Sequence, residues 1–394
     1  MAANNLTFEQ ASAFLTDLYE QASGSKAIAV TDTGSFVTVA QLTLKTGYDN
    51  VVNAISQVLG RTIFSIRPYT ARFSGIQVDA QRWGGIVRKI NYVDKDIEND
   101  DRIPLTDGSS VDMYEIKKPE PVQTNFYGGT TYQQSITVFR DQLDVAFSGP
   151  DEFSRFIGGV MQNIMDQLEQ IRESEARACL ANFITGKSAA SNGMINVLQE
   201  YYDQTGVELS VATMYSDTYY VPFAKWLYAY VNGLTRKLAE RTTLYHINIT
   251  GKELHRHTPA DRLKAYMSAR AMDAINSIAL PSVYGADRMK MVDWEAVAYW
   301  QNILSPEEII AKPTYLATDG SLTTSVNNVT VSNIIGVLFD EEALGMTRIN
   351  EWMMPSPWNA RGGYVNYFWH FTQRIWNDFT ENGVVLYAGT VTTS

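Results

Sequence analysis

The sequence predicts an α+β fold, because helix-like and strand-like periodicities occupy separate parts of the chain. Residues 151–185 carry apolar side chains at helical spacing, which predicts one helix of about 35 residues and roughly 50 Å. Residues 61–140 contain strand-like runs separated by glycines. Residues 345–389 hold four of the eight tryptophans and alternate in polarity, as a strand does.

The first 60 residues predict two short amphipathic helices, since apolar residues recur at helical spacing over 8–20 and over 48–59. The following region shows no obvious helix before residue 140. Within it, strands are predicted at 63–66, 85–93 and 135–139.

Charge is segregated within this strand-rich region. Residues 61–90 hold six basic side chains and one acid, whereas residues 91–120 hold nine acids and four bases. If the two segments form a single hairpin, their opposite charges would pair across its strands. If they lie on a neighbouring copy, the charges would fix the register and orientation of the two copies relative to each other. Both interpretations stay open at this point, because isolated surface ion pairs contribute under about 1 kcal/mol.

The long helix has a clear start, with Pro150 in the first turn and Asp151 and Glu152 complementing the helix dipole. Gly186 is the predicted stop. Such a rod suits a structural backbone. Further along the chain, helices are predicted at 221–240 and 260–278, and a strand at 329–339.

The C-terminal ribbon is predicted to place Val365, Tyr367, Trp369, Phe371 and Ile375 on one apolar face. Asn382-Gly383 predicts a tight hairpin turn, with 384–387 as the return strand. A lone hairpin cannot bury this much aromatic surface. Another part of the chain, or another copy of it, must therefore cover the ribbon.

Composition narrows the class of protein. A chain of 394 residues with 45% hydrophobic content predicts a folded protein of two or more lobes. The net charge of −11 argues against a nucleic-acid-binding surface. A single cysteine, Cys179, indicates a reducing compartment. Residues 1–9 lack the pattern of a signal peptide, and the apolar run 220–234 is too short to span a membrane.

No motif supports an enzyme. Gly186-Lys187-Ser188 satisfies a relaxed phosphate-loop pattern, but it ends a helix, whereas phosphate binding needs the start of one. His255 and His257 lack further metal ligands, and the acidic run 94–101 lacks the glycine and glutamate of a calcium loop. The sequence therefore predicts no catalytic residue, cofactor or metal, and Cys179 is predicted to be a small buried residue.

The order of these elements resembles the major capsid proteins of tailed bacteriophages, which have the Hong Kong 97-type fold. The segments that carry the resemblance are 167–187 (QLEQIRESEARACLANFITGK), 336–345 (GVLFDEEALG), 348–352 (RINEW) and 359–364 (NARGGY), the last continuing to residue 389.

The resemblance implies a structural, self-assembling protein. It implies an N-terminal arm (1–60), an E-loop (61–140), a peripheral domain with the spine helix (141–241), an axial domain (242–345) and a return to the peripheral domain (346–394). Many copies would form pentamers and hexamers of an icosahedral shell around double-stranded DNA, assembled in the bacterial cytoplasm. A separate scaffolding protein, a portal and noncovalent assembly are implied, and no membrane is involved.

The charged loop and the aromatic ribbon supply the predicted contacts between subunits. These candidates are Arg67, Arg72, Arg82, Arg88, Lys89, Asp94, Asp96, Glu98, Asp100, Asp101, Trp352 and Trp358. Two alternatives remain beside the shell hypothesis. The aromatic residues would also suit a β-rich carbohydrate-binding or fibre protein, and the relaxed phosphate-loop pattern a nucleotide-binding enzyme.

Overall fold

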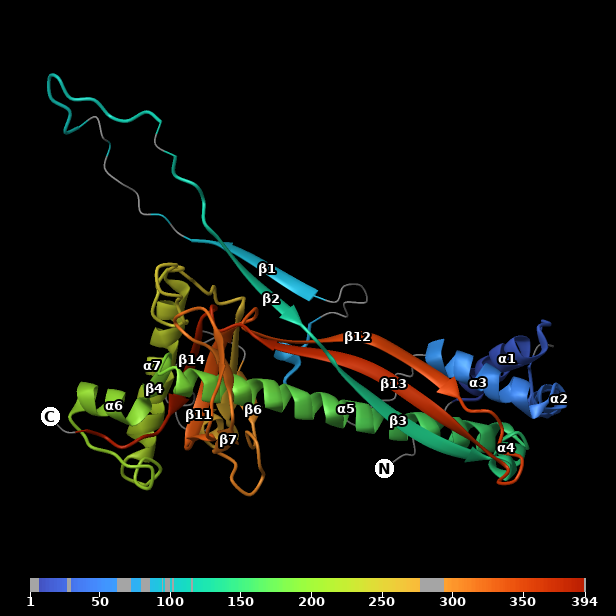
Figure 1. The fold of residues 1–394 in the computed structure, drawn as a ribbon. Helices are drawn as coiled ribbons and strands as arrows, with labels where there is room; N and C mark the ends of the chain where they lie inside the picture. The colour runs from blue at the N-terminus through green and yellow to red at the C-terminus, as the bar shows by residue number, and fades with distance from the viewer. Residues whose placement is uncertain are drawn as a thin grey trace.

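The computed structural model describes residues 7–26, 30–61, 72–78, 86–93, 95, 100, 103–114, 116–276 and 294–392. One long helix joins two packed ends of the molecule, and a hairpin projects away from the body (Figure 1). The helices are α1 (Phe8–Ser23), α2 (Thr33–Lys45), α3 (Tyr48–Arg61), α4 (Arg140–Ala146), α5 (Pro150–Ala189), α6 (Val197–Thr205), α7 (Tyr220–Ala239) and α8 (Ala269–Ala274), with a 3-10 turn at Ser74–Ile76.

The strands form five sheets, with orders β1-β2, β10-β7, β4-β14-β11-β5-β6, β12-β13-β3 and β8-β9 among the described residues. Their bounds are β1 (Ile86–Tyr92), β2 (Pro121–Tyr127), β3 (Thr130–Phe139), β4 (Met194–Asn196), β5 (Leu263–Ser268), β6 (Trp294–Val297), β7 (Ile309–Ala311), β8 (Thr314–Leu316), β9 (Leu322–Thr324), β10 (Val329–Val331), β11 (Ile334–Asp340), β12 (Leu344–Pro355), β13 (Tyr364–Asn377) and β14 (Gly383–Tyr387). The predicted strand at 85–93 is confirmed by β1 and that at 135–139 by β3, while 63–66 lies outside the described residues.

The N-terminal helices pack around the first turns of α5. Leu15, Phe36 and Val51 are buried there against Phe153 of α5. The two predicted N-terminal helices are confirmed by α1 and α3, but α2 was missed. Its sequence, TGSFVTVAQLTLK, is rich in β-branched residues, which have low intrinsic helix propensity. Asp32 caps this helix and its buried face packs into the core, so tertiary contacts stabilise it.

The predicted long helix is confirmed by α5, which begins at Pro150 and extends for 40 residues. It continues past the predicted stop at Gly186 to Ala189. A Cβ on Gly186 would lie 2.6 Å from the ring of Phe379. Glycine is therefore needed here for close packing, and not to end the helix.

The five-stranded sheet packs against α5 on one face and against α6, α7 and α8 on the other. Every residue of its central strand, β11, is buried, as expected for a strand covered on both faces. The predicted helix at 221–240 is confirmed by α7. The predicted helix at 260–278 is wrong, because β5 pairs with β11 and β6 before the short α8 begins. The predicted strand at 329–339 is divided into β10 and β11.

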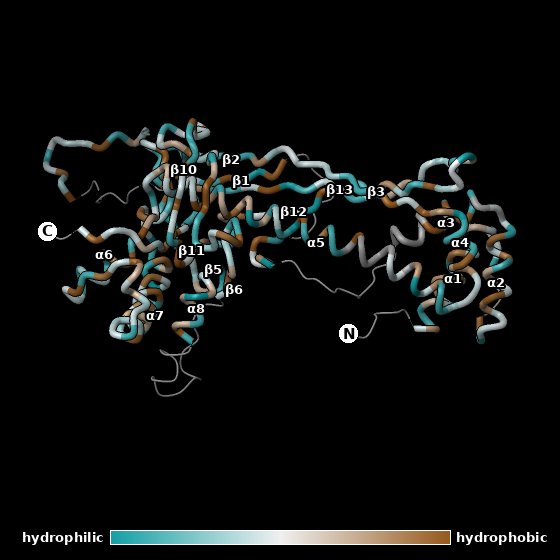
Figure 2. The backbone as a smooth tube through the Cα atoms, turned by 90° about the horizontal axis from the view of Figure 1, so that it is seen from below, coloured by the Kyte–Doolittle hydropathy of each residue, from teal (hydrophilic) through white to brown (hydrophobic). Residues whose placement is uncertain are grey.

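The aromatic ribbon consists of β12 and β13, and β3 extends it into a three-stranded sheet. Figures 1 and 2 show this sheet running alongside α5 between the two ends of the molecule. Trp369 and Phe371 pack on Ile164 and Leu168 of α5, so the same chain covers the ribbon. The predicted alternation holds through Phe371 and then shifts, because Gln373 and Arg374 are both buried and Ile375 is exposed.

The predicted hairpin at Asn382-Gly383 is wrong. The return strand, β14, pairs with β11 and β4 of the other sheet and not with β13. Asn382 is fully buried, and its Nδ2 donates to Oγ1 of Thr258 at 3.2 Å. A Cβ on Gly383 would lie 2.4 Å from the ring of Phe183. Both residues therefore serve packing between elements, and not a tight turn.

Candidate assembly interface

The most prominent projecting feature of the described chain is the hairpin arm, defined here as the described residues of 86–127. β1 and β2 pair from Ile86 and Tyr127 to Tyr92 and Pro121, and the intervening segment extends far from the body (Figure 1). Ile103, Met113, Tyr114 and Ile116 in this segment are 76–82% exposed. Such apolar exposure is typical of a surface that a partner covers.

The segregated charges do not pair across this hairpin. Arg88 lies opposite Asn125, and Lys89 lies opposite Thr124. β2 contains no charged residue. The acids of the acidic segment, residues 94–120, all precede β2 in the sequence. The interpretation in which the two charged segments pair strand to strand is therefore wrong for β1.

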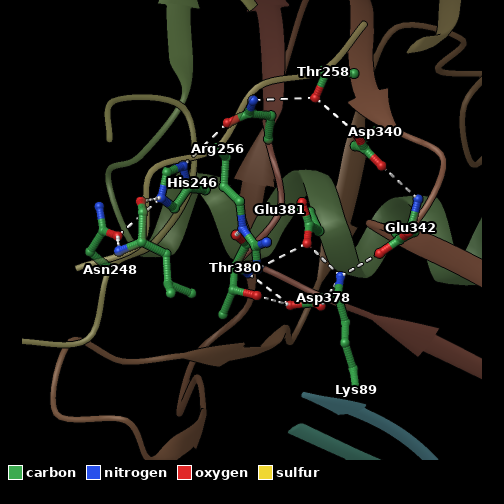
Figure 3. A network of polar contacts seen from close by, with 12 residues as sticks. Lys89, His246, Asn248, Arg256, Thr258, Asp340, Glu342, Asp378, Thr380 and Glu381 are labelled. Carbon is green, nitrogen blue, oxygen red and sulfur yellow. Dashed lines mark hydrogen bonds and ion pairs between the residues drawn. The ribbon is translucent and has the colours of Figure 1, made fainter. Parts of the chain in front are cut away.

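Lys89 instead anchors the hairpin arm to the body. Its Nζ lies 3.0 Å from Glu342, 2.9 Å from Asp378 and 2.5 Å from Glu381 (Figure 3). Glu342 lies in the turn between β11 and β12, whereas the other two acids lie in the connection between β13 and β14. One ammonium group thus ties the arm to the two connections that join the three-stranded and the five-stranded sheets.

Two arginines of the body complete this anchor cluster. Arg256 pairs with Glu381 at 3.0 Å and donates from Nε to the carbonyl of Thr380 at 3.1 Å. Arg262 pairs with Glu342 at 2.5 Å and with Asp340 at 3.4 Å. The anchor cluster is therefore a connected network in which each cation contacts more than one acceptor, as Figure 3 shows for the residues around Lys89 and Arg256.

Burial and charge act in opposite directions on these groups. The Lys89 side chain is 16% exposed, and burial disfavours its charge, but the carboxylates of Asp378 and Glu381 outweigh burial and raise its pKa. Burial raises the pKa of Glu381 despite Lys89 and Arg256. For Glu342, burial is outweighed by Lys89 and Arg262, which lower its pKa. Lys89 therefore stays protonated and balances acids that are otherwise poorly solvated.

Other contacts between described residues also join the hairpin arm to the body. The ring of Phe126 lies 6.1 Å from that of Trp376, and Glu120 pairs with Lys252 at 3.4 Å. A cavity of about 550 Å³ lies between arm and body, lined in part by Val87, Phe126 and Trp376. Part of the arm thus lies over a hollow, and of the two ion-paired sites described here Lys89 is far more buried than Glu120.

Several of the predicted contact residues are not placed by the structure. Arg67, Arg82, Asp94, Asp96, Glu98 and Asp101 lie outside the described residues. Arg72 donates to the carbonyl of Ala296 at 3.4 Å, and Asp100 and Arg88 are exposed on the arm. Whether these residues contact a second subunit stays a prediction.

The two predicted contact tryptophans have different environments. Trp352 is 43% exposed on the outer face of the ribbon, where its ring stacks on His370 at 3.9 Å. Trp358 packs against the N-terminal core, among residues of the same chain.

The acids that bind Lys89 were missed by the sequence analysis. They lie more than 250 positions further along the chain, and nothing in their local sequence relates them to β1. The exposed apolar side chains within 103–116 were also missed, although Ile103, Met113, Tyr114 and Ile116 stand among many polar and turn-forming residues. This mixture of apolar residues and loop-forming residues was the available signal.

Two of the residues considered for chemistry, Lys187 and Cys179, are buried. Lys187 is fully buried and donates to Oδ1 of Asn192 and to the carbonyl of Tyr245, both at 3.0 Å. Burial lowers its pKa to about 7. Cys179 is buried as predicted, which raises the pKa of its thiol to about 12. Among the described residues, no group of three or more His, Cys, Asp or Glu side chains is arranged to hold a metal ion, and no helix could cross a membrane.

Comparison with solved structures places this architecture among phage capsids. The chain is similar to one in the capsid structure of Staphylococcus phage Andhra, with a TM-score of 0.54 and 10% identity over 84% of this chain and 87% of that chain. It is similar to a chain in the structure of head fiber and inner core protein gp22 of native bacteriophage P68, with a TM-score of 0.56 and 10% identity over 84% and 87%. At this identity the likeness shows a shared fold.

Sequence comparison extends this result. No curated protein matches the chain. The carbohydrate-binding, fibre and nucleotide-enzyme hypotheses find no support in these comparisons, and family and fold point to a structural, non-enzymatic protein. The model of the Phi29-like phage major capsid protein family matches residues 14–387, and the chain therefore belongs to this family of capsid shell proteins.

Proposed function

We propose that this capsid protein builds its shell by laying the hairpin arm over a neighbouring copy, within pentamers and hexamers that close an icosahedral lattice around double-stranded DNA. The observation that carries the proposal is the exposure of Ile103, Met113, Tyr114 and Ile116 on a segment that projects from the body. Burial of these side chains by a neighbour provides the hydrophobic contribution to assembly.

The anchor cluster supports this proposal because it orients the arm. A two-stranded hairpin is only marginally stable by itself, and β1 and β2 contact the body at few points. Lys89 links β1 to the connections between the three-stranded and the five-stranded sheets, which limits the directions in which the arm projects. A fixed projection is what repeated contacts between identical copies require.

We assign roles to the remaining parts by the same logic. Residues 1–60 form the N-terminal arm and 61–140 the E-loop, while α5 and the ribbon form the peripheral domain within residues 141–241 and 346–394, apart from β4 and β14. The axial domain is centred on residues 242–345. Because β4 and β14 belong to the same five-stranded sheet as β5 and β11, we propose that the axial domain extends to include them.

Other partners follow from the chemistry of the chain. The net charge of −11 supports an interior wall that repels packaged DNA and leaves it mobile. We propose a separate scaffolding protein and a portal as assembly partners, noncovalent contacts between subunits, and assembly in the cytoplasm of the bacterial host.

Deletion of the projecting loop tests the central proposal. A variant joins Tyr92 to Pro121, which lie opposite each other in the hairpin, through a two-residue Asn-Gly turn. We expect this protein to fold with wild-type thermal stability but to form no shells by negative-stain microscopy, whereas the wild type forms capsomers and shells. Normal shells from the loop-deleted protein would refute the role of the arm.

A further inference from the structure

We propose that a cavity between α5 and the aromatic ribbon binds hydrogenphosphate, the protonated form of inorganic phosphate. This site is separate from the hairpin arm and goes beyond the proposed role of the arm in assembly. The cavity has a volume of about 420 Å³, and its lining includes Arg172 of α5, Arg348 of β12 and Gln373 of β13. A volume of this size with a few convergent polar groups is typical of a small-ligand site.

The cavity lies where the apolar alternation of the ribbon ends. Gln373 is 3% exposed and pairs with Arg348 on the opposite strand, next to a shift in register between Arg348 and Asn350. An irregularity of this kind redirects side chains and is common beside functional sites. Burying a carboxamide or a guanidinium group is unfavourable unless a hydrogen-bond partner is present. Packing alone therefore does not explain these polar residues.

Two buried atoms at this cavity indicate what kind of ligand it takes. Within the part of the chain that the structure describes, Nη2 of Arg348 donates to no acceptor and Oε1 of Gln373 accepts from no donor. Buried polar groups in folded proteins are nearly always paired. A ligand that accepts one hydrogen bond and donates another satisfies both atoms.

The side chains in this region leave an excess of positive charge. Arg172 forms an ion pair with Glu169, one turn earlier on α5. Arg348 forms an ion pair through Nη1 with Glu351 on β12. Arg374, which follows the glutamine on β13, is itself buried. Three guanidinium groups therefore stand against two carboxylates, and guanidinium groups bind phosphate oxygens through paired hydrogen bonds.

Hydrogenphosphate meets each of these requirements. In the proposed complex its charged oxygens accept hydrogen bonds from Arg172 and from Nη2 of Arg348, while its P–OH group donates to Oε1 of Gln373. Sulfate carries no proton at neutral pH, so the amide oxygen repels it. A carboxylate is ionised at this pH and has the same disadvantage. Water donates and accepts as well but is neutral, and it is the competing occupant.

Bound hydrogenphosphate links three elements of the subunit. Arg172 belongs to the long helix α5, Arg348 to β12 and Gln373 to β13, so one ligand bridges the helix and both strands of the ribbon. A ligand that binds only the folded state raises thermal stability as its concentration increases. The site therefore makes the packing of the ribbon on α5 sensitive to phosphate.

Titration with inorganic salts tests the site. Sodium phosphate and sodium sulfate are each added to the purified protein in phosphate-free buffer at neutral pH and equal ionic strength, and binding is measured by isothermal titration calorimetry. We expect one phosphate per chain, bound about tenfold more tightly than sulfate, together with a higher melting temperature. If phosphate does not bind, water alone occupies the cavity. If sulfate binds equally well, Gln373 does not recognise the P–OH group. Either result overturns the proposal.

A pair of variants on α5 locates the bound anion. Arg172→Lys keeps the charge and the ion pair with Glu169 but loses the planar pair of donors, so it should weaken phosphate binding by about tenfold. The matched control is Arg155→Lys, because Arg155 pairs with Glu152 in the same i,i+3 arrangement, is 63% exposed and does not line the cavity. Its phosphate affinity should equal that of the wild type. Unchanged binding in Arg172→Lys, or equal losses in both variants, would overturn the site.

Replacement of the glutamine tests selectivity. Gln373→Met keeps a similar volume and removes the acceptor, so phosphate should lose its preference over sulfate, and a variant that keeps this preference would contradict the role of the P–OH group. If this buried substitution prevents folding, Arg172→Lys still decides, because its side chain is 21% exposed and its ion pair is retained. Loop-deleted protein should bind phosphate as the wild type does, so failure of this site and failure of the proposed function are distinguishable.

Discussion

The ribbon β12–β13 and the hairpin arm β1–β2 are both antiparallel strand pairs with apolar residues, but they are completed in different ways. The inner face of the ribbon is buried on α5 and the N-terminal helices of the same chain. In the arm, Ile86, Ile90, Tyr92 and Tyr127 remain exposed. The ribbon therefore folds with the subunit, whereas the arm is held by an ionic anchor and keeps apolar side chains exposed, which we propose neighbouring copies cover.

This difference separates stability from assembly. Substitutions in the ribbon should change the free energy of unfolding of a single subunit. Substitutions on the exposed arm should leave that free energy unchanged and alter only the contacts between subunits.

The largest effect is expected at Trp369. This side chain is 7% exposed, packs on Ile164 and Leu168, and donates from Nε1 to Oε1 of Glu351 at 3.0 Å. Trp369→Ala should lower the free energy of unfolding by about 3 to 5 kcal/mol, because it removes buried aromatic surface and leaves a cavity. Urea denaturation of the unassembled subunit measures the loss.

Trp352 provides the matched control on the opposite face of the same ribbon. It stacks on His370 but is 43% exposed, so Trp352→Ala should lower the free energy of unfolding by about 1 kcal/mol or less. Equal losses of unfolding free energy in the two variants would show that α5 does not bury one face of the ribbon more than the other.

An intermediate effect is expected at Lys89. Lys89→Met leaves Asp378 and Glu381 with one cation fewer, and removing one partner of a buried ion pair destabilises by several kcal/mol. Because Arg256 still balances Glu381, we expect a loss of about 2 kcal/mol, concentrated in the arm. Hydrogen exchange should show faster exchange of the β1 and β2 amides while the five-stranded sheet stays protected.

The adjacent residue is the control for this experiment. Arg88 precedes Lys89 on the same strand but points to the exposed side. Arg88→Met should leave amide exchange in β1 unchanged. If both variants accelerate exchange equally, the arm is not held by the Lys89 cluster.

A smaller effect is expected from pH at His246, beside the anchor cluster. The ring is buried, with Nε2 2.7 Å from the carbonyl of Leu254, and burial lowers its pKa. Since the unfolded state binds a proton that the folded state does not, stability should fall as pH drops below about 6.5. The raised pKa of Glu381 has the opposite effect, because protonation of this carboxylate at low pH favours the folded state. The effect of His246 must therefore be measured against a variant that lacks only the histidine.

The measurement compares wild type with His246→Gln at pH 7.5 and pH 5.5. We expect thermal stability of the wild type to decrease more on acidification than that of the variant. An identical decrease in both proteins would show that His246 does not oppose protonation in the folded state.

The smallest effect on stability is expected for charge reversal on the arm. Arg88→Glu combined with Arg82→Glu should change the free energy of unfolding by less than about 0.5 kcal/mol, because Arg88 is exposed. The same variant should form fewer shells if these charges contact neighbouring copies, as the proposed role of the arm requires. Counting shells by electron microscopy measures this effect. A variant that forms as many shells as the wild type would exclude a role for these charges in assembly.

Prediction from the sequence succeeded where the pattern is local. The long helix and the alternation from Val365 to Phe371 each follow from residues that are close in sequence. It failed for β5, whose short apolar run is compatible with helix or strand until β11 and β6 are placed beside it. The prediction of a turn at Asn382-Gly383 was also wrong, because contacts with the distant residues Phe183 and Thr258 decide the conformation there.

The amino-acid sequence by itself determined which segments bury one face, and its resemblance to capsid proteins was confirmed by the family match. Only the tertiary structure decided which sheet each C-terminal strand joins, which acids hold Lys89 and which apolar residues stay uncovered. Periodicity is a property of neighbouring residues, and it specifies local backbone geometry. Ion pairing and exposure depend on contacts between residues hundreds of positions apart, which only the packed chain brings together.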